Sequence, residues 1–297
     1  MSEGRQSRLQ LAEALTHFEA CGLNDERRVD LTRGRPFLAV DDTKTVGVDD
    51  AFRVNRRNSG FDVEVAAADA SQLLGHPTIV SCITERNSSL YRTGKTAMTL
   101  PRPIVLALGL QAGKRQRALV IRQSFDRQGG RRGNPVLIPA LIRAGRTTPE
   151  ILAQTVLKNP RHPLLTGAYL IEKRQPRKPT DVADPARLRR LGSELVATYT
   201  TFANRLAAQW AGNEYVPVLC QRHAHLGMTA IEPYYAYSGT DTATEQPHYA
   251  QITSALRRGI DAINHMNLGH HLAHKSPVFD SEMLDRVAMN FNAPNVA

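Results

Sequence analysis

Four carboxylates fall within ten residues of this chain, between two apolar runs that are typical of strands. They are Asp41, Asp42, Asp49 and Asp50. Hard divalent cations such as Mg²⁺ and Mn²⁺ prefer oxygen ligands, and a catalytic Mg²⁺ is usually held by a few carboxylates while substrate phosphate and water complete its shell. An acidic cluster in a basic protein therefore favours phosphodiester chemistry.

The spacing of these carboxylates constrains which of them can meet. If a strand runs through residue 41, Asp41 and Asp42 point to opposite faces, so only one of them can face a site. Asp49 and Asp50 then return to Asp41 through a loop in which Gly47 supplies a permissive backbone. Three clustered carboxylates repel one another unless a metal or a set of Arg and Lys groups neutralises them, so their crowding predicts a bound metal. An exposed acidic turn is the simpler alternative.

A second set of residues with nucleic-acid chemistry lies near the C-terminal end. We expect a helix that begins at Ser254, which is a good N-cap. Arg257 and Arg258 then lie in the first turn, where their charges and the free N–H groups of the helix start form a phosphate-binding corner. The same helix would align Arg257, Asp261 and His265 on one face. A surface ion pair between Arg257 and Asp261 is therefore the simpler alternative.

The elements that must position these residues follow from hydrophobic periodicity. Apolar spacing predicts an amphipathic helix over residues 7–21, and a period-two pattern predicts a β-rich region over residues 36–75. Helices dominate after a charged, proline-bearing connector over residues 173–184. A long helix is expected over residues 186–211, with Arg205 off its apolar stripe. That stripe consists of Leu188, Leu191, Leu195, Tyr199, Phe202 and Leu206.

A basic segment over residues 113–134 flanks an expected strand at Ala118–Ile121. It includes the run Arg127-Gln128-Gly129-Gly130-Arg131-Arg132-Gly133. Hairpin turns with a solvated rim and a dedicated RNA contact both explain this composition.

Composition agrees with a globular protein that binds a polyanion. The chain has 297 residues, 41% of them hydrophobic, which is enough for a sizeable core. Lys and Arg outnumber Asp and Glu by 38 to 28, a formal charge of +10 that favours nucleic acid as a partner. The three cysteines, Cys21, Cys82 and Cys220, lack the spacing of a disulfide framework or zinc finger.

No membrane partner is expected. No apolar run approaches the roughly 20 residues that span a bilayer, and the N-terminus lacks the apolar core of a signal peptide. We therefore expect a cytoplasmic protein.

Read in order, several segments resemble the RNB catalytic domain of the ribonuclease II and ribonuclease R family, over nearly the whole chain. The matching segments are Arg28–Thr32, Pro36–Asp41, Asp49–Phe52, Ala67–Ser71, Arg86–Tyr91, Met98–Pro101, Thr201–Ala208 and Thr253–Arg258. Among them, Thr253–Arg258 is similar to the family's "TSPIRR" and Ala67–Ser71 to its "ADVS".

The resemblance implies a mixed α/β (α+β) fold, with twisted mixed sheets flanked by helices around a central RNA channel. Residues 1–30 would form an N-terminal helix packed on the core, and residues 31–297 an RNB-like catalytic domain without flanking OB or S1 domains. The implied activity is metal-dependent 3′→5′ hydrolysis of single-stranded RNA to nucleoside 5′-monophosphates, with Mg²⁺ or Mn²⁺ as cofactor.

The resemblance also implies roles for individual residues, carried over by position. The metal ligands would be Asp41, Asp49 and Asp50. The catalytic residues would be Asp49, Asp50, Arg257 and Arg258, with one of the two arginines holding the scissile phosphate. The substrate-binding residues would be Tyr91, which would stack on the terminal nucleotide, Asp69, Asn204 and Arg205.

The chain departs from the family pattern at three positions. The second of the family's four aspartates falls on Gly47, Ala255 replaces a proline, and Gly259 replaces an aromatic residue. A site short of one carboxylate predicts weak or absent activity. The alternative is therefore a catalytically inactive RNB-like protein that binds RNA or acts as an interaction module. An unrelated metal hydrolase of small phosphoesters is a third hypothesis.

Overall fold

The computed structural model describes residues 25–45, 47–73, 80–81, 83–84, 90–92, 95–97, 99–173, 184–223, 229–234 and 249–292. The helix expected over residues 7–21 lies outside these ranges. The described chain already joins the main sheet at Val29, two residues before the domain boundary expected at residue 31.

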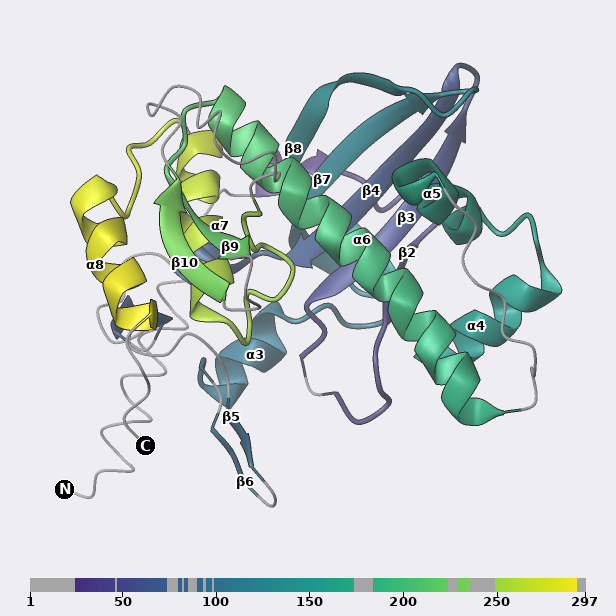
Figure 1. Ribbon diagram of the computed structural model, residues 1–297, viewed down its shortest axis with the longest axis horizontal. Coiled ribbons are helices and arrows are strands. Elements are labelled where there is room, and N and C mark those ends of the chain that lie inside the picture. The colour runs from purple at the N-terminus through teal and green to yellow at the C-terminus, as the bar shows by residue number, and fades with distance from the viewer. Residues whose placement is uncertain are drawn as a thin grey trace.

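A six-stranded mixed sheet forms the centre of the structure (Figure 1). Its strands are β1 (Val29–Asp30), β2 (Phe37–Val40), β3 (Asp50–Arg57), β4 (Gly60–Ala68), β7 (Arg115–Asp126) and β8 (Arg131–Thr147). Their order is β1-β8-β2-β3-β4-β7, with β1 and β2 parallel to β8 and the other pairs antiparallel. The sheet closes on itself because the long strand β8 pairs with both β2 and β7.

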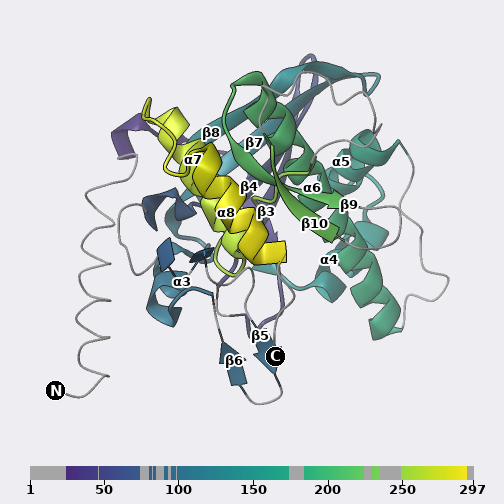
Figure 2. The ribbon, with the colours of Figure 1, turned by 60° about the vertical axis from the view of Figure 1, so that its left-hand side comes forward.

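Helices cover both faces of this sheet (Figures 1 and 2). They are α3 (Arg102–Leu108), α4 (Pro149–Lys158), α5 (Pro163–Glu172), α6 (Pro185–Asn213), α7 (Gly259–Leu272) and α8 (Ser281–Asn292). The smaller elements are the 3₁₀ turns η1 (Asp25–Arg27) and η2 (Ala70–Leu73), the hairpin β5 (Leu90–Arg92) with β6 (Lys95–Ala97), and the hairpin β9 (Val218–His223) with β10 (Thr229–Tyr234). None of the helices in the described ranges is long and apolar enough to cross a membrane.

Alternation along the strands divides the buried side chains into two cores. Phe52 and Val54 of β3 pack with α4, α5 and α6, whereas Ala51 belongs to the core that contains α3, α7 and α8. On β4, Val63 and Val65 join the first of these cores, while Asp62 and Glu64 point to the opposite face, as period two requires. The expected β-rich region is therefore present, and β4 is buried on both faces.

The acidic face of β4 is neutralised across the strands. Glu64 accepts hydrogen bonds from Arg53 Nε at 2.6 Å and from Arg122 Nε at 2.7 Å. Arg53 and Arg122 are its register partners on β3 and β7. Because the Glu64 side chain has no exposure to solvent, these two guanidinium groups offset the cost of burying its charge.

The long helix α6 confirms the expectation for residues 186–211. Asp184 caps it by accepting the Ala186 N–H at 2.9 Å, and Pro185 takes the first helical position. Every residue of the expected apolar stripe is buried, and Arg205 is exposed. Figure 1 shows α6 running diagonally across the sheet.

The helix start expected at Ser254 is wrong. α7 begins at Gly259, and Arg258 is its N-cap residue without a side-chain cap. Residues 254–258 form a turn instead, in which the N–H groups of Arg257 and Arg258 both donate to the Ser254 carbonyl. The two arginines therefore do not lie in the first turn of a helix, and the expected corner of free helical N–H groups around them is not formed.

Close packing of α6 on α4 gives a test of this architecture. A Cβ atom at Gly192 would overlap the backbone carbonyl of Pro149, which cannot move without separating the two helices. We expect Gly192→Ala to lower the free energy of unfolding by about 1–3 kcal/mol, the usual cost of overpacking. Thermal unfolding would measure the loss. Ser193→Ala, at the exposed neighbouring position, is the matched control, and equal midpoints for the two variants would contradict the packing.

Candidate functional site

A cavity of about 920 Å³ lies beside the first residues of β3 and the start of α3. Its polar lining consists of Asp41, Lys44, Thr45, Asp49, Asp50, Arg102 and Arg257. The structure thus brings the three expected carboxylates and Arg257 to one cavity. Arg258 is not part of its wall.

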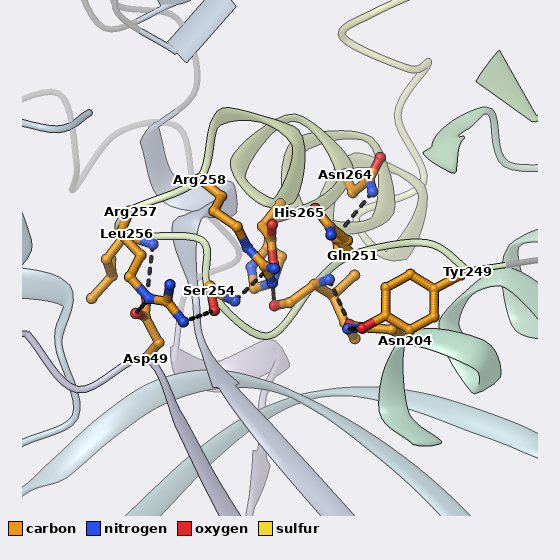
Figure 3. Close-up of polar contacts among 12 residues, drawn as sticks. Asp49, Asn204, Tyr249, Gln251, Ser254, Leu256, Arg257, Arg258, Asn264 and His265 are labelled. Atoms are coloured by element: carbon orange, nitrogen blue, oxygen red, sulfur yellow. Dashed lines mark hydrogen bonds and ion pairs between the residues drawn. The ribbon is translucent and has the colours of Figure 1, made fainter. Parts of the chain in front are cut away.

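Asp49 is the most constrained carboxylate at this cavity. Its Oδ1 accepts the Leu256 N–H at 2.9 Å, and its Oδ2 accepts Arg257 Nε at 3.1 Å (Figure 3). The residue is only 7% exposed. Burial raises the pKa of Asp49 to about 6, although the Arg257 guanidinium and the Leu256 N–H act in the opposite direction. The ion pair with Arg257 therefore favours the charged form of Asp49 at a position where burial disfavours it.

The other two carboxylates have different environments. Burial, followed by the neighbouring charge of Asp49, raises the pKa of Asp50 well above its usual value. Asp41 is half-buried, and its Oδ1 accepts the Asp42 N–H at 2.9 Å and the Thr45 hydroxyl at 2.6 Å. Asp41 therefore holds the loop that follows β2.

The loop after β2 is also fixed from outside the cavity. Arg189 of α6 donates to Asp42 Oδ2 at 2.7 Å and to Glu150 Oε1 at 2.7 Å. Arg146 of β8 donates to the carbonyl groups of Asp42 and Thr45. Asp42 thus points away from Asp49 and Asp50 and anchors the loop, in agreement with the expectation that only one of the adjacent pair faces the site.

The carboxylates do not form a ready metal centre. Within the described ranges, no group of three or more His, Cys, Asp or Glu side chains is arranged to hold a metal ion. Arg257 supplies positive charge beside Asp49, which is the other way of neutralising the cluster that the sequence allowed. The residues do not fit a multi-ion centre as they stand, and binding of Mg²⁺ or Mn²⁺ stays a prediction.

Close packing, and not a special backbone conformation, accounts for the glycine at residue 47. It is absent from the described glycines with positive φ, so the permissive backbone expected there is not required. A Cβ atom at residue 47 would instead overlap Cγ1 of Val105, a buried residue of α3. The side chain of Val105 thus fills the place where an aspartate at residue 47 would begin.

Arg258 makes an ion pair on the other side of the turn. Its Nη2 lies 2.8 Å from Oδ1 of Asp261, which also accepts the Ser254 N–H at 2.7 Å. The simpler alternative from the sequence paired Asp261 with Arg257, and this is wrong because Arg257 reaches Asp49 instead. The two adjacent arginines therefore serve two different carboxylates.

Asp69 has a structural role at the end of β4. It is fully buried and lies 2.6 Å from Arg28 Nη2, and its other oxygen accepts the Ser71 N–H at 2.8 Å. Although burial acts in the opposite direction, these groups hold the pKa of Asp69 below its usual value. Asp69 does not line the cavity, so its expected contact with substrate has no support in the geometry.

His265 of α7 is buried and is hydrogen-bonded to the residue that follows Asp69. The Ala70 N–H donates to His265 Nδ1 at 3.3 Å, so the ring proton sits on Nε2, which donates to the Ile252 carbonyl at 2.7 Å. Burial lowers the pKa of His265, which favours this neutral form. His265 therefore does not share an exposed face with Arg257.

Of the remaining expected substrate-binding residues, Asn204 and Arg205 are not part of the cavity lining. Asn204 is buried, and it binds the Tyr249 hydroxyl at 2.8 Å and the Ile252 N–H at 2.9 Å. It ties the segment before α7 to helix α6. Arg205 is exposed on α6. Tyr91 lies on β5, and its side chain is outside the described part of the structure.

Three cavity residues were missed from the sequence. Lys44 and Arg102 bring exposed positive charge to its edge, and Val105 forms part of its wall. A lysine between two aspartate pairs was the available signal for Lys44. No local pattern identifies Arg102 or Val105, because their position depends on α3 packing against the loop at residue 47.

Three solved structures are similar to this chain over most of its length. The apo form of RNase R from Mycoplasma genitalium matches with a TM-score of 0.69 and 18% identity, over 93% of this chain and 58% of that one. An active-site mutant of the Dss1 exoribonuclease from Candida glabrata matches with a TM-score of 0.70 and 14% identity, over 91% and 44%. Yeast Ssd1, a pseudonuclease, also matches with a TM-score of 0.70 and 14% identity, over 90% and 43%.

The fold is that of an RNB domain. The sequence resemblance is thus confirmed at the level of the fold, including the mixed α/β class. The chain spans about 43–58% of the length of these three proteins. No protein-family model and no curated protein matches the sequence. The RNB fold is shared by proteins with and without nuclease activity, so the fold alone does not decide between them.

The raised pKa of Asp49 gives a testable dependence on pH. The folded value of about 6 exceeds the ordinary 3.8, so between these values the folded protein binds more protons than the unfolded chain. The free energy of unfolding therefore falls as pH rises through this window, by about 3 kcal/mol for this group. We expect the advantage of the wild-type protein over Asp49→Asn to shrink by most of this amount between pH 4 and 7.

Urea unfolding at a series of pH values would measure this difference. The matched control is Asp285→Asn, at an exposed position on α8, which should run parallel to the wild-type protein. A constant difference between wild type and Asp49→Asn over the same range would contradict the assigned environment of Asp49.

Proposed function

We propose that this chain is an RNB-fold protein that binds single-stranded RNA at the carboxylate-lined cavity without hydrolysing it. The observation that carries this proposal is the packing at residue 47. The resemblance implies an aspartate there, but the side chain of Val105 occupies the space that its Cβ would need. In addition, Asp49 uses both oxygens for Leu256 and Arg257.

RNA is the ligand that the charges at the cavity favour. Lys44, Arg102 and Arg257 are exposed and line it, and guanidinium groups bind phosphate well. Structural neighbours include RNase R from Mycoplasma genitalium in complex with ribose-methylated single-stranded RNA and with double-stranded RNA. The pseudonuclease Ssd1 is as similar to this chain in TM-score as the exoribonuclease Dss1, so an RNB fold without catalysis has a precedent among the structural neighbours, and the choice rests on the side chains of the cavity.

A metal-dependent 3′→5′ exoribonuclease that releases nucleoside 5′-monophosphates is the second candidate. The observation that favours it is the presence of Asp41, Asp49 and Asp50 around one cavity. Mg²⁺ or Mn²⁺ bound there would supply Lewis-acid chemistry to the phosphodiester. The residues would first have to rearrange, because Arg257 is paired with Asp49.

A metal series separates the two candidates. We expect the protein to leave a labelled single-stranded RNA intact in Mg²⁺ and in Mn²⁺, and to bind it equally well in EDTA. Denaturing gels would follow cleavage, and fluorescence anisotropy would follow binding. Mononucleotide release that Asp50→Asn abolishes would instead establish the exoribonuclease, and absence of binding in every condition would reject both candidates.

Restoring the missing carboxylate is a second test, and the structure dictates how to make it. Gly47→Asp alone should lower the melting temperature because of the overlap with Val105. Val105→Ala removes the overlapping atom and leaves Leu256 Cδ1 at 3.5 Å, which is ordinary contact. We expect the double variant Gly47→Asp/Val105→Ala to bind RNA without turning it over, because Arg257 still neutralises Asp49.

Both single variants serve as controls for the double variant. A large gain in turnover for the double variant, absent from Val105→Ala, would show a nuclease that lost one ligand and would overturn the proposal of a dedicated binder.

A further inference from the structure

The two long hairpins of the sheet end side by side, at the end opposite to the cavity. In the register of β4 and β7, Gly60 pairs with Asp126 and Phe61 with Phe125. Figure 1 shows both turns together at the upper right. We call residues 56–62 and 124–132 the hairpin tip.

The hairpin tip carries a large excess of positive charge. Its exposed cations are Arg56, Arg57, Arg127, Arg131 and Arg132. Its two carboxylates are engaged: Asp62 accepts Arg57 Nε and Ser124 Oγ, both at 2.8 Å, and Asp126 accepts the Gly130 N–H of its own turn at 2.7 Å. The arginines therefore dominate the electrostatic potential that an approaching ligand meets.

A polar pocket of about 260 Å³ opens within the hairpin tip. Two guanidinium groups, from Arg57 and Arg132, and two hydroxyl groups, from Ser59 and Ser124, line it together with Phe61, Phe125 and the carboxylate of Asp62, which is paired with Arg57. The Arg57 side chain is 55% exposed although it pairs with Asp62. Arginine and serine are among the side chains that contact phosphate oxygens in nucleic-acid complexes, and they do so without regard to base sequence.

Other cations of the hairpin tip hold its shape. Arg127 donates from Nε at 3.0 Å and from Nη2 at 2.6 Å to the Asn58 carbonyl, which joins the two turns. The Arg131 guanidinium lies 5.4 Å from the ring centroid of Phe202 on α6. The pocket arginines are therefore presented on a braced scaffold, which lowers the entropy lost when a ligand binds.

The hairpin tip is remote from the cavity. Asp50 and Arg57 are the two ends of β3, and a strand of that length spans about 23 Å. A stacked single strand that advances about 3.4 Å per nucleotide covers this distance with about seven nucleotides. A short oligonucleotide can thus occupy one of the two places, whereas a longer strand can reach both.

We propose that the hairpin tip binds the phosphate backbone of RNA outside the cavity. This inference rests on the proposed RNA binding and adds a second contact surface to it. A protein partner fits less well, because protein interfaces centre on apolar and aromatic side chains. None of the exposed large hydrophobic residues of the described chain lies in the hairpin tip.

The test compares two lengths of RNA and two double variants. Arg57→Gln/Arg132→Gln removes the pocket cations, and Arg190→Gln/Arg286→Gln removes the same charge from exposed positions on α6 and α8. Binding of a 6-nucleotide and a 20-nucleotide labelled RNA would be measured by fluorescence anisotropy over a salt series. Circular dichroism would verify that each variant is folded.

We expect the pocket variant to bind the 20-mer roughly tenfold more weakly, with a salt slope smaller by about 1.4 for two lost contacts to a single strand. The pocket variant should lose less affinity for the 6-mer than for the 20-mer, because a 6-mer occupies only one of the two places, and the control variant should match the wild-type protein for both. An unchanged 20-mer affinity in the pocket variant would overturn the hairpin tip proposal alone. Failure of the wild-type protein to bind either RNA would overturn the proposed function, and the tip proposal with it.

Wild-type protein supplies an independent measure that needs no variant. Its salt slope should be steeper for the 20-mer than for the 6-mer, because more phosphates are neutralised. Equal slopes would overturn the second contact surface even if a variant proved unstable.

Discussion

The contact of Asp49 with the turn at residues 254–258 determines the rest of the site. A buried carboxylate is costly unless it is paired and hydrogen-bonded, and Asp49 meets both requirements through Arg257 and the Leu256 N–H. This contact joins the start of β3 to a segment more than 200 residues away in sequence. It shapes the cavity wall and holds Arg257 beside the carboxylates, in a turn that ends where α7 begins at Gly259.

Packing around Gly47 fixes the chemical character of the same region. The loop between β2 and β3 passes close to α3, and Val105 takes the space beside it. The absence of a carboxylate at residue 47 and the close apolar contact with Val105 are therefore one structural feature. A nuclease and a protein without nuclease activity can share every strand and helix while differing in such a contact, which is why similarity of fold to both kinds of protein leaves the chemistry to individual side chains.

Most of the fold was predictable from local pattern, and most of the site was not. The stripe of α6 and the alternation along β4 depend on residues near in sequence, and both were found in the structure. The partner of Arg257 was not predictable, because a local ion pair with Asp261 and a distant one with Asp49 are equally consistent with the spacing. Asp69 was similarly ambiguous until its pairing with Arg28 was known.

The distribution of charge follows from the same constraint. Arginines that face buried carboxylates, such as Arg53 beside Glu64 and Arg258 beside Asp261, are committed to the interior. The formal charge of +10 is therefore not spread evenly over the surface. At the hairpin tip, Asp62 and Asp126 are hydrogen-bonded within the turns, and the exposed arginines around them outnumber these carboxylates. The arginines there are therefore available to a ligand. Net charge indicates the class of partner, but the pairing of each carboxylate decides where that partner can bind.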